Sequence, residues 1–225
     1  MGRGFRKEPA VRRAENSMAS IMIHLQTAHR LLQPGGLLFQ KVREPGRYYL
    51  GVTAPDSVNL DGFASKEIRW AAHLRAKTPK QWYQNIEEFY HKQLKKADAD
   101  FLLGYIFHNI TDAAFDETLH NPIWASAAKA YAPELSANDA GWEDSFRYDM
   151  SQRETDWWRE VRPALAGARC QDFHTISGEL MGRHRDYLLA DYWDRPCQEP
   201  PKVITREMVW LLADYTEGPL AKILK

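Results

Sequence analysis

The amino-acid sequence predicts a mainly α-helical fold, built as a single compact multi-helix domain. Apolar residues recur at helical spacing in several segments, residues typical of helix ends separate these segments, and no segment alternates apolar and polar residues as a strand does. The 225 residues suffice for one sizeable core, and we expect about seven or eight helices over residues 18–225. Residues 1–17 are expected to be a disordered extension, or to lie ahead of a start at Met18 or Met22.

The first predicted helix covers the segment "IMIHLQTAHRLLQ". Ser20 precedes it as a suitable N-cap, and the sequence PGG at 34–36 ends it. Its core-facing stripe is formed by Ile21, Leu25, Ala28 and Leu32. The next segment, 37–58, lacks helical periodicity and contains two prolines, so we expect a long connection with a short extended piece.

Three helices are expected in the centre of the chain. The first covers about residues 65–76. The sequence TPKQ at 78–81 predicts a capping box for the second, with threonine as N-cap, proline at the first helical position and glutamine as the reciprocal partner. The third is strongly apolar; it begins at Asp98 or Asp100 and ends near the HNP sequence at 120–122.

The second half of the chain is also expected to be helical. Two helices are predicted at about 139–161 and 176–193, with a break near the Arg-Pro sequence at 162–163. The last helix covers about residues 205–224, where a Gly-Pro pair leaves open whether the helix continues unbroken.

The composition restricts the class of protein. Lys plus Arg and Asp plus Glu each number 30, so the formal net charge is zero. A general nucleic-acid-binding protein is expected to carry a basic excess that neutralises phosphates, so this balance argues against that class. The two cysteines, Cys170 and Cys197, form no CxxC pair and suggest no disulfide framework. Because no apolar run approaches the ~20 residues of a membrane span, we expect a cytoplasmic protein without a transmembrane segment.

The central apolar helix carries two polar side chains that require a reason. His108 and Asp112 are four positions apart in "FLLGYIFHNITDAAF", so their side chains share one face. A helix that is apolar on nearly all sides is normally buried, and an ionised aspartate there is costly unless it is paired or bound to a cation. The pair can bind one metal ion, or it can form a structural hydrogen bond shared with Asn109 or Thr111.

Two further residues favour a metal site. Asp56 directly follows a proline in a loop, and His73 lies among apolar neighbours in "RWAAHLR". Each has an ordinary interpretation, since an aspartate after proline often caps a turn and a histidine on an apolar face is usually a core residue. Together with His108 and Asp112, they form a set of two imidazoles and two carboxylates. These donors are typical of zinc, or of manganese or iron when more oxygen ligands join.

Four segments in chain order resemble the bacterial zinc-dependent phospholipase C-like family: "MIHLQTAHRLL", "YYLGVTAPDSV", "AAHLR…W…IEEFY" and "FLLGYIFHNITD". The wider superfamily contains secreted phospholipases C and single-strand nucleases, all-helical enzymes with metal clusters. The resemblance spans about residues 18–116, with weaker similarity in "FRYDMSQRETDWW". It implies the phospholipase C/nuclease fold and a principal zinc site formed by Asp56, His73, His108 and Asp112.

The resemblance also implies that His24, in the first helix, binds another ion. Secreted relatives use the free amino group of the mature N-terminus as a further ligand, whereas other residues precede His24 here. The third site of such clusters needs another histidine, which His120 can supply, and an HxxxE element, which does not follow. We therefore expect one or two ions instead of three.

The metal site, together with what the resemblance implies, predicts a metal-dependent hydrolase of phosphoric esters, in particular phosphodiesters, that uses a metal-activated water. Asp56 is the candidate general base, because a loop carboxylate can exchange between metal and water. Arg75 can contact a phosphate or form a surface salt bridge. The expected substrate is a small-molecule or lipid phosphodiester. Phosphohydrolases of the HD type fit less well because the chain contains no adjacent His-Asp pair.

The alternative is a non-catalytic helical protein that binds metal or a partner, with the polar cluster in a structural role. His174 and His184 have no ligand spacing and are expected on the surface. Asp149 and Asp156 are expected to form helix-surface or helix–helix polar contacts. Loss of bound zinc in a His108→Ala variant would distinguish the metal site from a purely structural network.

Overall fold

The computed structural model describes residues 19–118, 122–194, 197 and 199–225. Over these residues the chain is mainly α-helical and contains no β-strand, which confirms the predicted fold class. The described part forms ten α-helices, more than the number expected: α1 (Ile21–Leu32), α2 (Pro45–Thr53), α3 (Lys66–Ala72), α4 (Pro79–Gln93), α5 (Ala99–Thr118), α6 (Pro122–Tyr131), α7 (Ala137–Ser151), α8 (Asp156–Ala166), α9 (Gly178–Leu189) and α10 (Arg206–Ile223). Two short 3-10 helices accompany them, η2 (Pro55–Asn59) and η3 (Asp191–Asp194).

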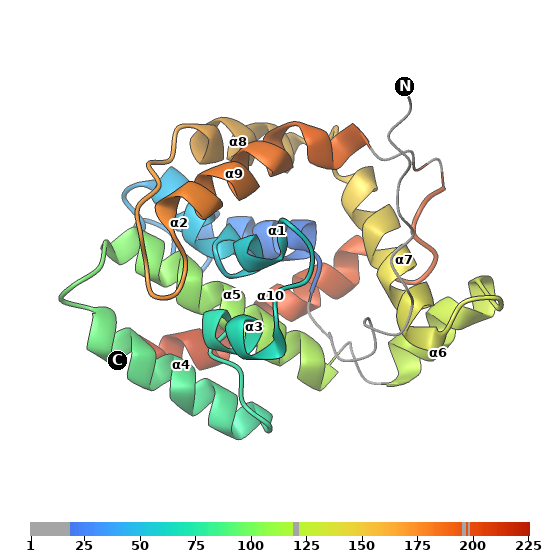
Figure 1. Cartoon of the computed structure of the whole chain (residues 1–225), viewed down its shortest axis with the longest axis horizontal. Helices are drawn as coiled ribbons and strands as arrows, with labels where there is room; N and C mark the ends of the chain where they lie inside the picture. Colours follow the sequence, from blue (N-terminus) through green and yellow to red (C-terminus); the bar gives the residue numbers. More distant parts are fainter. Residues whose placement is uncertain (1–18, 119–121, 195–196, 198) are drawn as a thin grey trace.

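Helix α5 runs through the middle of the molecule (Figure 1). Helix α2 packs along it, and α4 and α10 cover other parts of its surface. Helices α8 and α9 lie on one side next to α2, while α6 packs on α7 at another edge (Figure 1). Both α1 and η2 also contact α5. The polar face of α5 is therefore enclosed by elements from the first third of the chain.

The contact between α2 and α5 is a backbone-to-backbone approach at two glycines. A Cβ on Gly104 would lie 2.0 Å from the main-chain oxygen of Tyr48, and a Cβ on Gly51 would lie 2.1 Å from that of Phe101. No carbon atom can approach an oxygen so closely, so only glycine fits at these two positions. The close approach brings the C-terminal turn of α2 next to His108 on α5.

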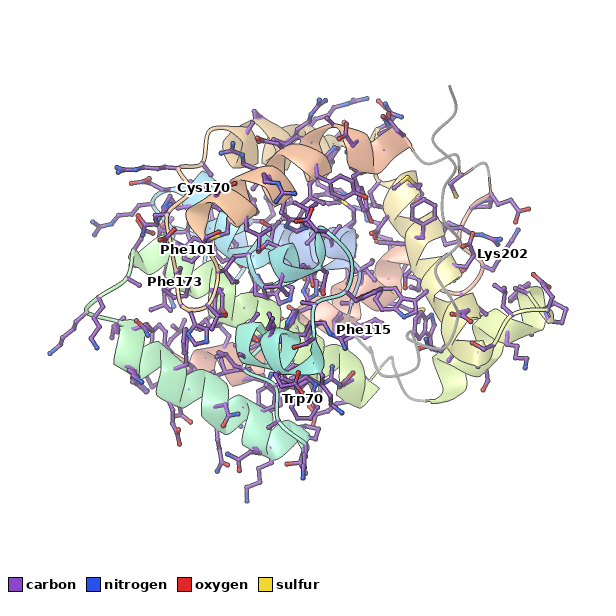
Figure 2. The ribbon with its side chains drawn as sticks, viewed as in Figure 1. Trp70, Phe101, Phe115, Cys170, Phe173 and Lys202 are labelled. Carbon is purple, nitrogen blue, oxygen red and sulfur yellow. The ribbon has the colours of Figure 1, made fainter. Side chains whose placement is uncertain are left out.

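Aromatic side chains connect the loop after α8 with α4 and α5. Phe173 lies in this loop, and its ring centroid is 5.0 Å from those of Phe101 and Tyr105. Phe89 of α4 packs on the same cluster, 5.5 Å from Tyr105. Figure 2 shows Phe101 and Phe173 close together at one end of α5. Such aromatic pairs add to the stabilisation that burial alone provides, so this end of α5 is firmly held.

The prediction of a long connection over residues 37–58 is wrong. Helix α2 occupies Pro45–Thr53, and η2 follows it almost directly. Pro45 takes the first helical position, where its missing N–H has no intrahelical partner to lose, so it begins a helix instead of interrupting one. Nearly all of α2 is buried, because α5 and α8 both pack on it. A proline in the sequence therefore does not by itself indicate a connection, because it is also typical of a helix start.

The helix boundaries in the second half also differ from the prediction. The break lies between Ser151 and Asp156, and the Arg-Pro sequence at 162–163 lies inside α8. Helix α10 continues unbroken through its Gly-Pro pair. A proline removes one backbone hydrogen bond, but Leu165 and Leu220, just after the two prolines, are fully buried. Tertiary packing thus keeps both helices continuous.

Two predicted caps are present only in part. The Thr78 side chain accepts a hydrogen bond from the N–H of Gln81 at 3.3 Å, but the Gln81 side chain donates to Asn85, so the capping box is not reciprocal. Ser20 is the N-cap residue of α1, yet its hydroxyl makes no cap bond. That hydroxyl is bonded to α7 instead, in a contact that matters for the site.

Two predictions fall outside the described residues. These are the disordered extension at residues 1–17 and the metal-binding role considered for His120. Within the described ranges, no helix combines the length and the apolar character that crossing a membrane requires.

Candidate metal centre

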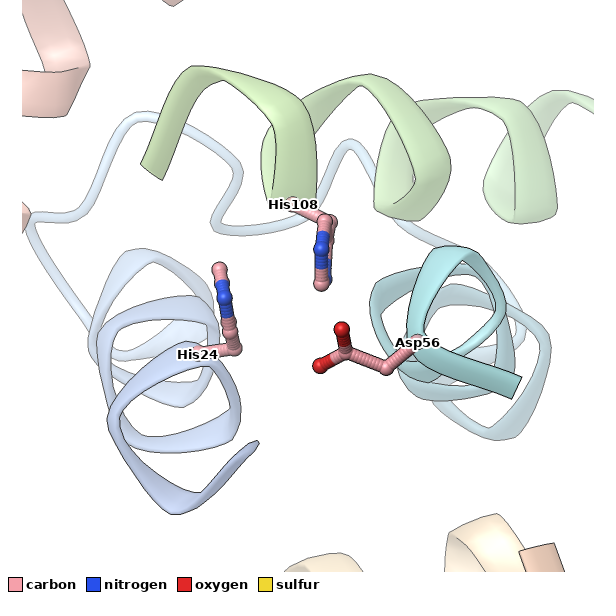
Figure 3. A group of neighbouring side chains, drawn as sticks. All are labelled: His24, Asp56 and His108. Atoms are coloured by element: carbon pink, nitrogen blue, oxygen red, sulfur yellow. The ribbon is translucent and has the colours of Figure 1, made fainter. Parts of the chain in front are cut away.

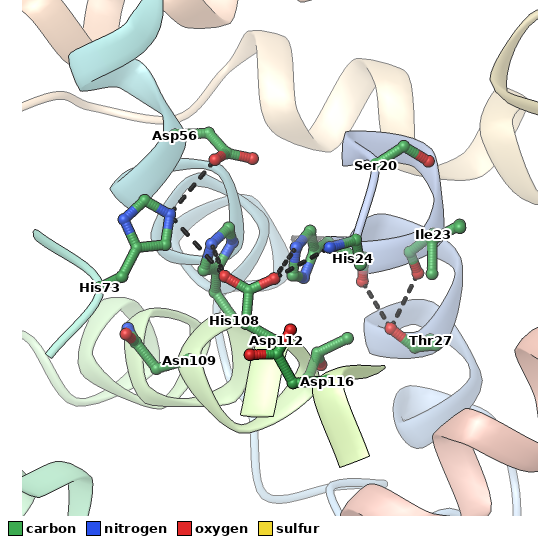
Figure 4. Close-up of polar contacts among 12 residues, drawn as sticks. Ser20, Ile23, His24, Thr27, Asp56, His73, His108, Asn109, Asp112 and Asp116 are labelled. Atoms are coloured by element: carbon green, nitrogen blue, oxygen red, sulfur yellow. Dashed lines mark hydrogen bonds and ion pairs between the residues drawn. The ribbon is translucent and has the colours of Figure 1, made fainter. Parts of the chain in front are cut away.

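The side chains predicted to bind metal lie together in the interior (Figure 4). They come from α1, η2, the end of α3, and α5: His24, Asp56, His73, His108 and Asp112. Four of them are at most 1% exposed, whereas the Asp56 side chain is 16% exposed. The fold thus gathers three imidazoles and two carboxylates from four separate elements at one buried place.

Helix α5 supplies the base of this centre. His108 and Asp112 share one face, as their spacing predicts, and both are fully buried. The Nε2 atom of His108 is 3.5 Å from Oδ2 of Asp112. The two atoms are therefore close enough to bind one ion, since each would be ~2 Å from it.

His73 connects α5 with η2. It is the C-cap residue of α3, and the indole N–H of Trp82 donates to its main-chain oxygen at 2.8 Å, which fixes the backbone there. The Nε2 atom of His73 is 3.3 Å from Oδ1 of Asp56 and 3.8 Å from Oδ2 of Asp112. A single imidazole nitrogen thus faces both carboxylates of the centre.

The second ring nitrogen decides the protonation of His73 and His108. The Nδ1 atom of His108 is 2.7 Å from the main-chain oxygen of Val52, and Nδ1 of His73 is 2.8 Å from that of Arg69. A carbonyl oxygen can only accept, so each Nδ1 carries a proton, and in the neutral ring each Nε2 carries a lone pair. A lone pair facing a carboxylate oxygen is repulsive, so either a proton or a metal ion is needed between each Nε2 and its carboxylate; the Nε2 atom of His73 is within hydrogen-bond distance of Asp56. A backbone carbonyl on the second nitrogen is also typical of metal-binding histidines.

His24 closes the centre from the side of α1. Its ring stacks on that of His108, with centroids 3.8 Å apart and planes inclined by 13°. Its Nε2 atom is 3.1 Å from Oδ1 of Asp112, which also accepts a hydrogen bond from the N–H of Ala19 at 3.0 Å. Figure 3 shows the two rings next to each other, with the Asp56 carboxylate extending toward them from η2.

The donor atoms fit a divalent ion. Ligand atoms of His73, His108 and Asp112 lie within 4.8 Å of one another, and so do ligand atoms of His24, Asp56 and His108. Both ring nitrogens of His24, Nε2 of His108 and Oδ2 of Asp112 are buried without a hydrogen-bond partner. Buried polar atoms are normally hydrogen-bonded, so this concentration of nitrogen and oxygen atoms without a hydrogen bond indicates a ligand. The buried His/Asp groups could hold a metal ion, and imidazole with carboxylate suits zinc.

Burial and neighbouring charges shift the pKa values of the centre in different directions. Burial alone would raise the pKa of Asp56, but the nearby His108 and His73 lower it to about 2. In the same way, His24 and His108 outweigh burial and hold the pKa of Asp112 well below its ordinary value.

The pKa values of His108 and His73 shift in opposite directions. Burial, together with His24, lowers the pKa of His108. Burial would also lower the pKa of His73, but the neighbouring Asp56 and Asp112 carboxylates raise it. The centre thus contains two ionised carboxylates in a place with almost no solvent, an arrangement that favours binding of a cation.

A pocket of about 370 Å³ leads to the centre. Asp56 lines it, together with His184 of α9 and Asp149 of α7. Its aromatic wall is formed by Phe63, Trp142, Phe146, Tyr187 and Tyr192. The described lining includes no lysine or arginine. A small molecule in the pocket would therefore meet the centre at Asp56.

The prediction that His184 lies on the surface is wrong. His184 is only 7% exposed, its ring is hydrogen-bonded to the main chain of Thr53, and burial lowers its pKa to about 4. Met181 and Leu188, three and four positions away on α9, are buried on the same side. This apolar spacing is the sequence signal for a buried histidine. His174, in contrast, is exposed as predicted.

The remaining candidates have structural contacts. The guanidinium of Arg75 forms an ion pair with Asp116 at 2.6 Å, which matches the salt-bridge alternative for this residue. Asp156 is exposed at the start of α8. Asp149 is buried and bonded to residues of α1 and η3, so it is a polar contact between elements, as expected.

Comparisons of the chain with protein-family models, with curated proteins and with solved structures give no match. We therefore infer function from the side chains of the centre and of the pocket beside it.

Proposed function

We propose that the chain is a metal-dependent hydrolase of phosphoric esters, with phosphodiesters as substrates and zinc as the favoured ion. One observation carries the proposal: the Nε2 atoms of His73 and His108 lie against the carboxylates of Asp56 and Asp112 in the interior, while each Nδ1 is held by a main-chain carbonyl. A divalent cation can bind within either of the two ligand sets that share His108. One or two ions fit the two overlapping ligand sets, and manganese or iron can replace zinc if water joins the ligands.

The chain's own residues have separate roles in this proposal. An ion held by these residues would supply Lewis acidity for a water and for a phosphoryl oxygen. Asp56 is the member of the centre that lines the pocket, so we assign it the role of general base for the attacking water. His24, His73, His108 and Asp112 are almost fully enclosed and serve as ligands.

The pocket favours a small substrate. Its wall is aromatic and acidic, and the described lining contributes no cationic side chain that would recognise further phosphates. A nucleic-acid chain carries a phosphate at every nucleotide and is normally bound by such cations. We therefore propose a small-molecule or lipid phosphodiester as substrate, in agreement with the sequence resemblance to phospholipase C-like proteins.

A second candidate function is a structural metal site in a non-catalytic protein. The specific observation in its favour is the burial of the centre, since four of the five side chains are at most 1% exposed. Structural zinc sites are closed, whereas catalytic sites keep one position open to water and substrate. The partial exposure of Asp56 toward the pocket is the feature that favours catalysis.

Hydrolysis of bis(4-nitrophenyl) phosphate tests the proposal. We expect activity that a chelator removes and added zinc restores. The His108→Ala variant should be inactive, whereas His91→Ala, which changes an exposed histidine on α4, should retain activity. Zinc bound without any hydrolysis would favour the structural site. Hydrolysis that survives His108→Ala would show that the centre is not responsible.

A further inference from the structure

Asp149 is a fully buried carboxylate that the proposed chemistry does not use. Its Oδ1 accepts a hydrogen bond from the Ser20 hydroxyl at 2.6 Å, and its Oδ2 accepts one from the Tyr192 hydroxyl. These bonds connect α7 with the beginning of α1 and with η3. Both oxygens are thus committed to neighbouring elements of the fold.

Ser20 is the point at which Asp149 acts on α1. It is the N-cap residue, but its hydroxyl donates to Asp149 and caps nothing in its own helix. The N–H of Met22, in the first turn, is also hydrogen-bonded to Asp149. The first N–H groups of a helix have no intrahelical partner and need an acceptor from elsewhere. A carboxylate of α7 therefore does for α1 what a capping side chain normally does.

Two groups at the same end of α1 contact Asp112 of the metal centre. The N–H of Ala19 donates to Oδ1 of Asp112, and the His24 ring lies 3.1 Å from that oxygen. The main-chain N–H of His24 donates to the main-chain oxygen of Ser20 at 3.1 Å, so Ser20 and His24 belong to one turn. Figure 4 shows Ser20 one turn before His24 on this helix. A displacement of Ser20 would move both groups relative to Asp112.

We infer that Asp149 is a positioning residue of the metal centre: through Ser20 it holds the first turn of α1, and with it the His24 ring, against Asp112. This role rests on the proposed metal site and adds to it a residue outside the ligand set. Residues that orient metal ligands without touching the ion typically change metal affinity by 10–100-fold when they are replaced.

The test is the affinity of the full chain for zinc, measured by competition with a chromogenic chelator, together with the absorption spectrum of bound Co²⁺. Asp149→Ala and Ser20→Ala are expected to weaken zinc binding about 10–100-fold and to shift the Co²⁺ spectrum toward that of His24→Ala. Ser20→Thr keeps the hydroxyl and should restore the affinity and spectrum of the unchanged chain.

Asp144→Ala is the matched control. Asp144 also lies on α7, is 3% exposed, and accepts main-chain hydrogen bonds from Val203 and Ile204 instead of from the beginning of α1. Its replacement is expected to lower the unfolding temperature without changing the zinc affinity or the Co²⁺ spectrum. A spectral change confined to Asp149→Ala and Ser20→Ala therefore separates positioning from general loss of stability.

The outcomes test the metal site and the role of Asp149 separately. An unchanged chain that binds neither zinc nor Co²⁺ would overturn the proposed metal site itself. If the unchanged chain binds, but both variants show the same affinity and spectrum as the unchanged chain, only the role of Asp149 is overturned. If Asp149→Ala does not fold, Ser20→Ala, which removes a single hydroxyl, decides alone.

Discussion

The imidazoles of His24 and His108 stack with ring centroids 3.8 Å apart, and neither ring is exposed to solvent. Two positively charged rings at this separation in the interior would repel one another, because the local dielectric is low. His24 accordingly contributes to the lowered pKa of His108, after burial. At least one ring is therefore neutral and presents a lone pair. A stacked pair of this kind beside two carboxylates is well suited to bind a cation.

Zinc is expected to stabilise the folded chain, because a ligand that binds only the folded state raises the free energy of unfolding. At a zinc concentration 100 times the Kd, the gain is about 2.7 kcal/mol. For a chain of this length the unfolding temperature should rise by about 5–10 °C. Thermal unfolding of chelator-treated protein, with and without added zinc, measures this rise in the unfolding temperature. The rise should vanish in His108→Ala and persist in His91→Ala; an equal rise in both would place the zinc elsewhere.

Replacement of Asp56 should separate catalysis from metal binding. Asp56→Asn keeps the size of the side chain but removes the charge that faces the pocket. We expect kcat to fall by about 100-fold or more, the scale of a lost general base, while zinc still binds through the remaining ligands. Steady-state kinetics at saturating zinc measure this effect. Unchanged kcat would exclude Asp56 as the base and leave it only a ligand.

The contact between α2 and α5 predicts an intolerance of side chains at Gly104. A Cβ there would clash with the main-chain oxygen of Tyr48, and relieving the clash would require moving one helix backbone away from the other. We expect Gly104→Ala to lower the free energy of unfolding by about 3 kcal/mol, measured by urea denaturation. Gly218→Ala, in open space on α10, is the control and should raise stability by up to about 1 kcal/mol. Equal effects at both positions would contradict the close helix contact.

The buried His184 predicts a specific loss of stability in mild acid. Burial lowers its pKa from 6.5 to about 4, so between these values the unfolded chain binds a proton that the folded chain does not. The contribution of His184 to the free energy of unfolding is complete above pH 6.5 and is lost as the pH falls toward 4.

Urea denaturation at pH 7.5 and pH 5, in the presence of a chelator, measures this contribution. The unchanged chain should lose about 2 kcal/mol more than His184→Gln between the two pH values, since each unit of pKa shift is worth about 1.36 kcal/mol. Other titrating groups are common to both proteins and cancel in the difference. The same loss in both would mean that His184 is not held neutral by burial.

Part of the site could be predicted from sequence because the relevant information is local. A helix repeats every 3.6 residues, so the four-residue spacing of His108 and Asp112 is sufficient to place them on one face. The position of Asp56 and His73 beside them depends on how η2 and α3 pack against α5, which no local pattern encodes. Their inclusion rests on their donor types and on the resemblance to the phospholipase C-like family, and the structure brings all four together.

The features that sequence reasoning missed share one physical cause. Helix α2 is short and buried on two sides, and its Pro45 indicates a break although it begins the helix. His184 has no ligand spacing and is for that reason expected on the surface, while the buried face of α9 is narrow. Asp149 acts through Ser20, a partner 129 positions away, and such distant pairings are set by tertiary packing alone.

Calorimetric titration of the chelator-treated chain with Zn²⁺ tests the central claim most directly, with His108→Ala titrated in parallel. His108 belongs to both ligand sets, so its removal damages every arrangement the centre offers. We predict saturable binding of one or two ions per chain by the unchanged protein and none by the variant. A titration without saturable binding, or with the same binding in His108→Ala, would contradict the metal centre and the hydrolase proposed from it.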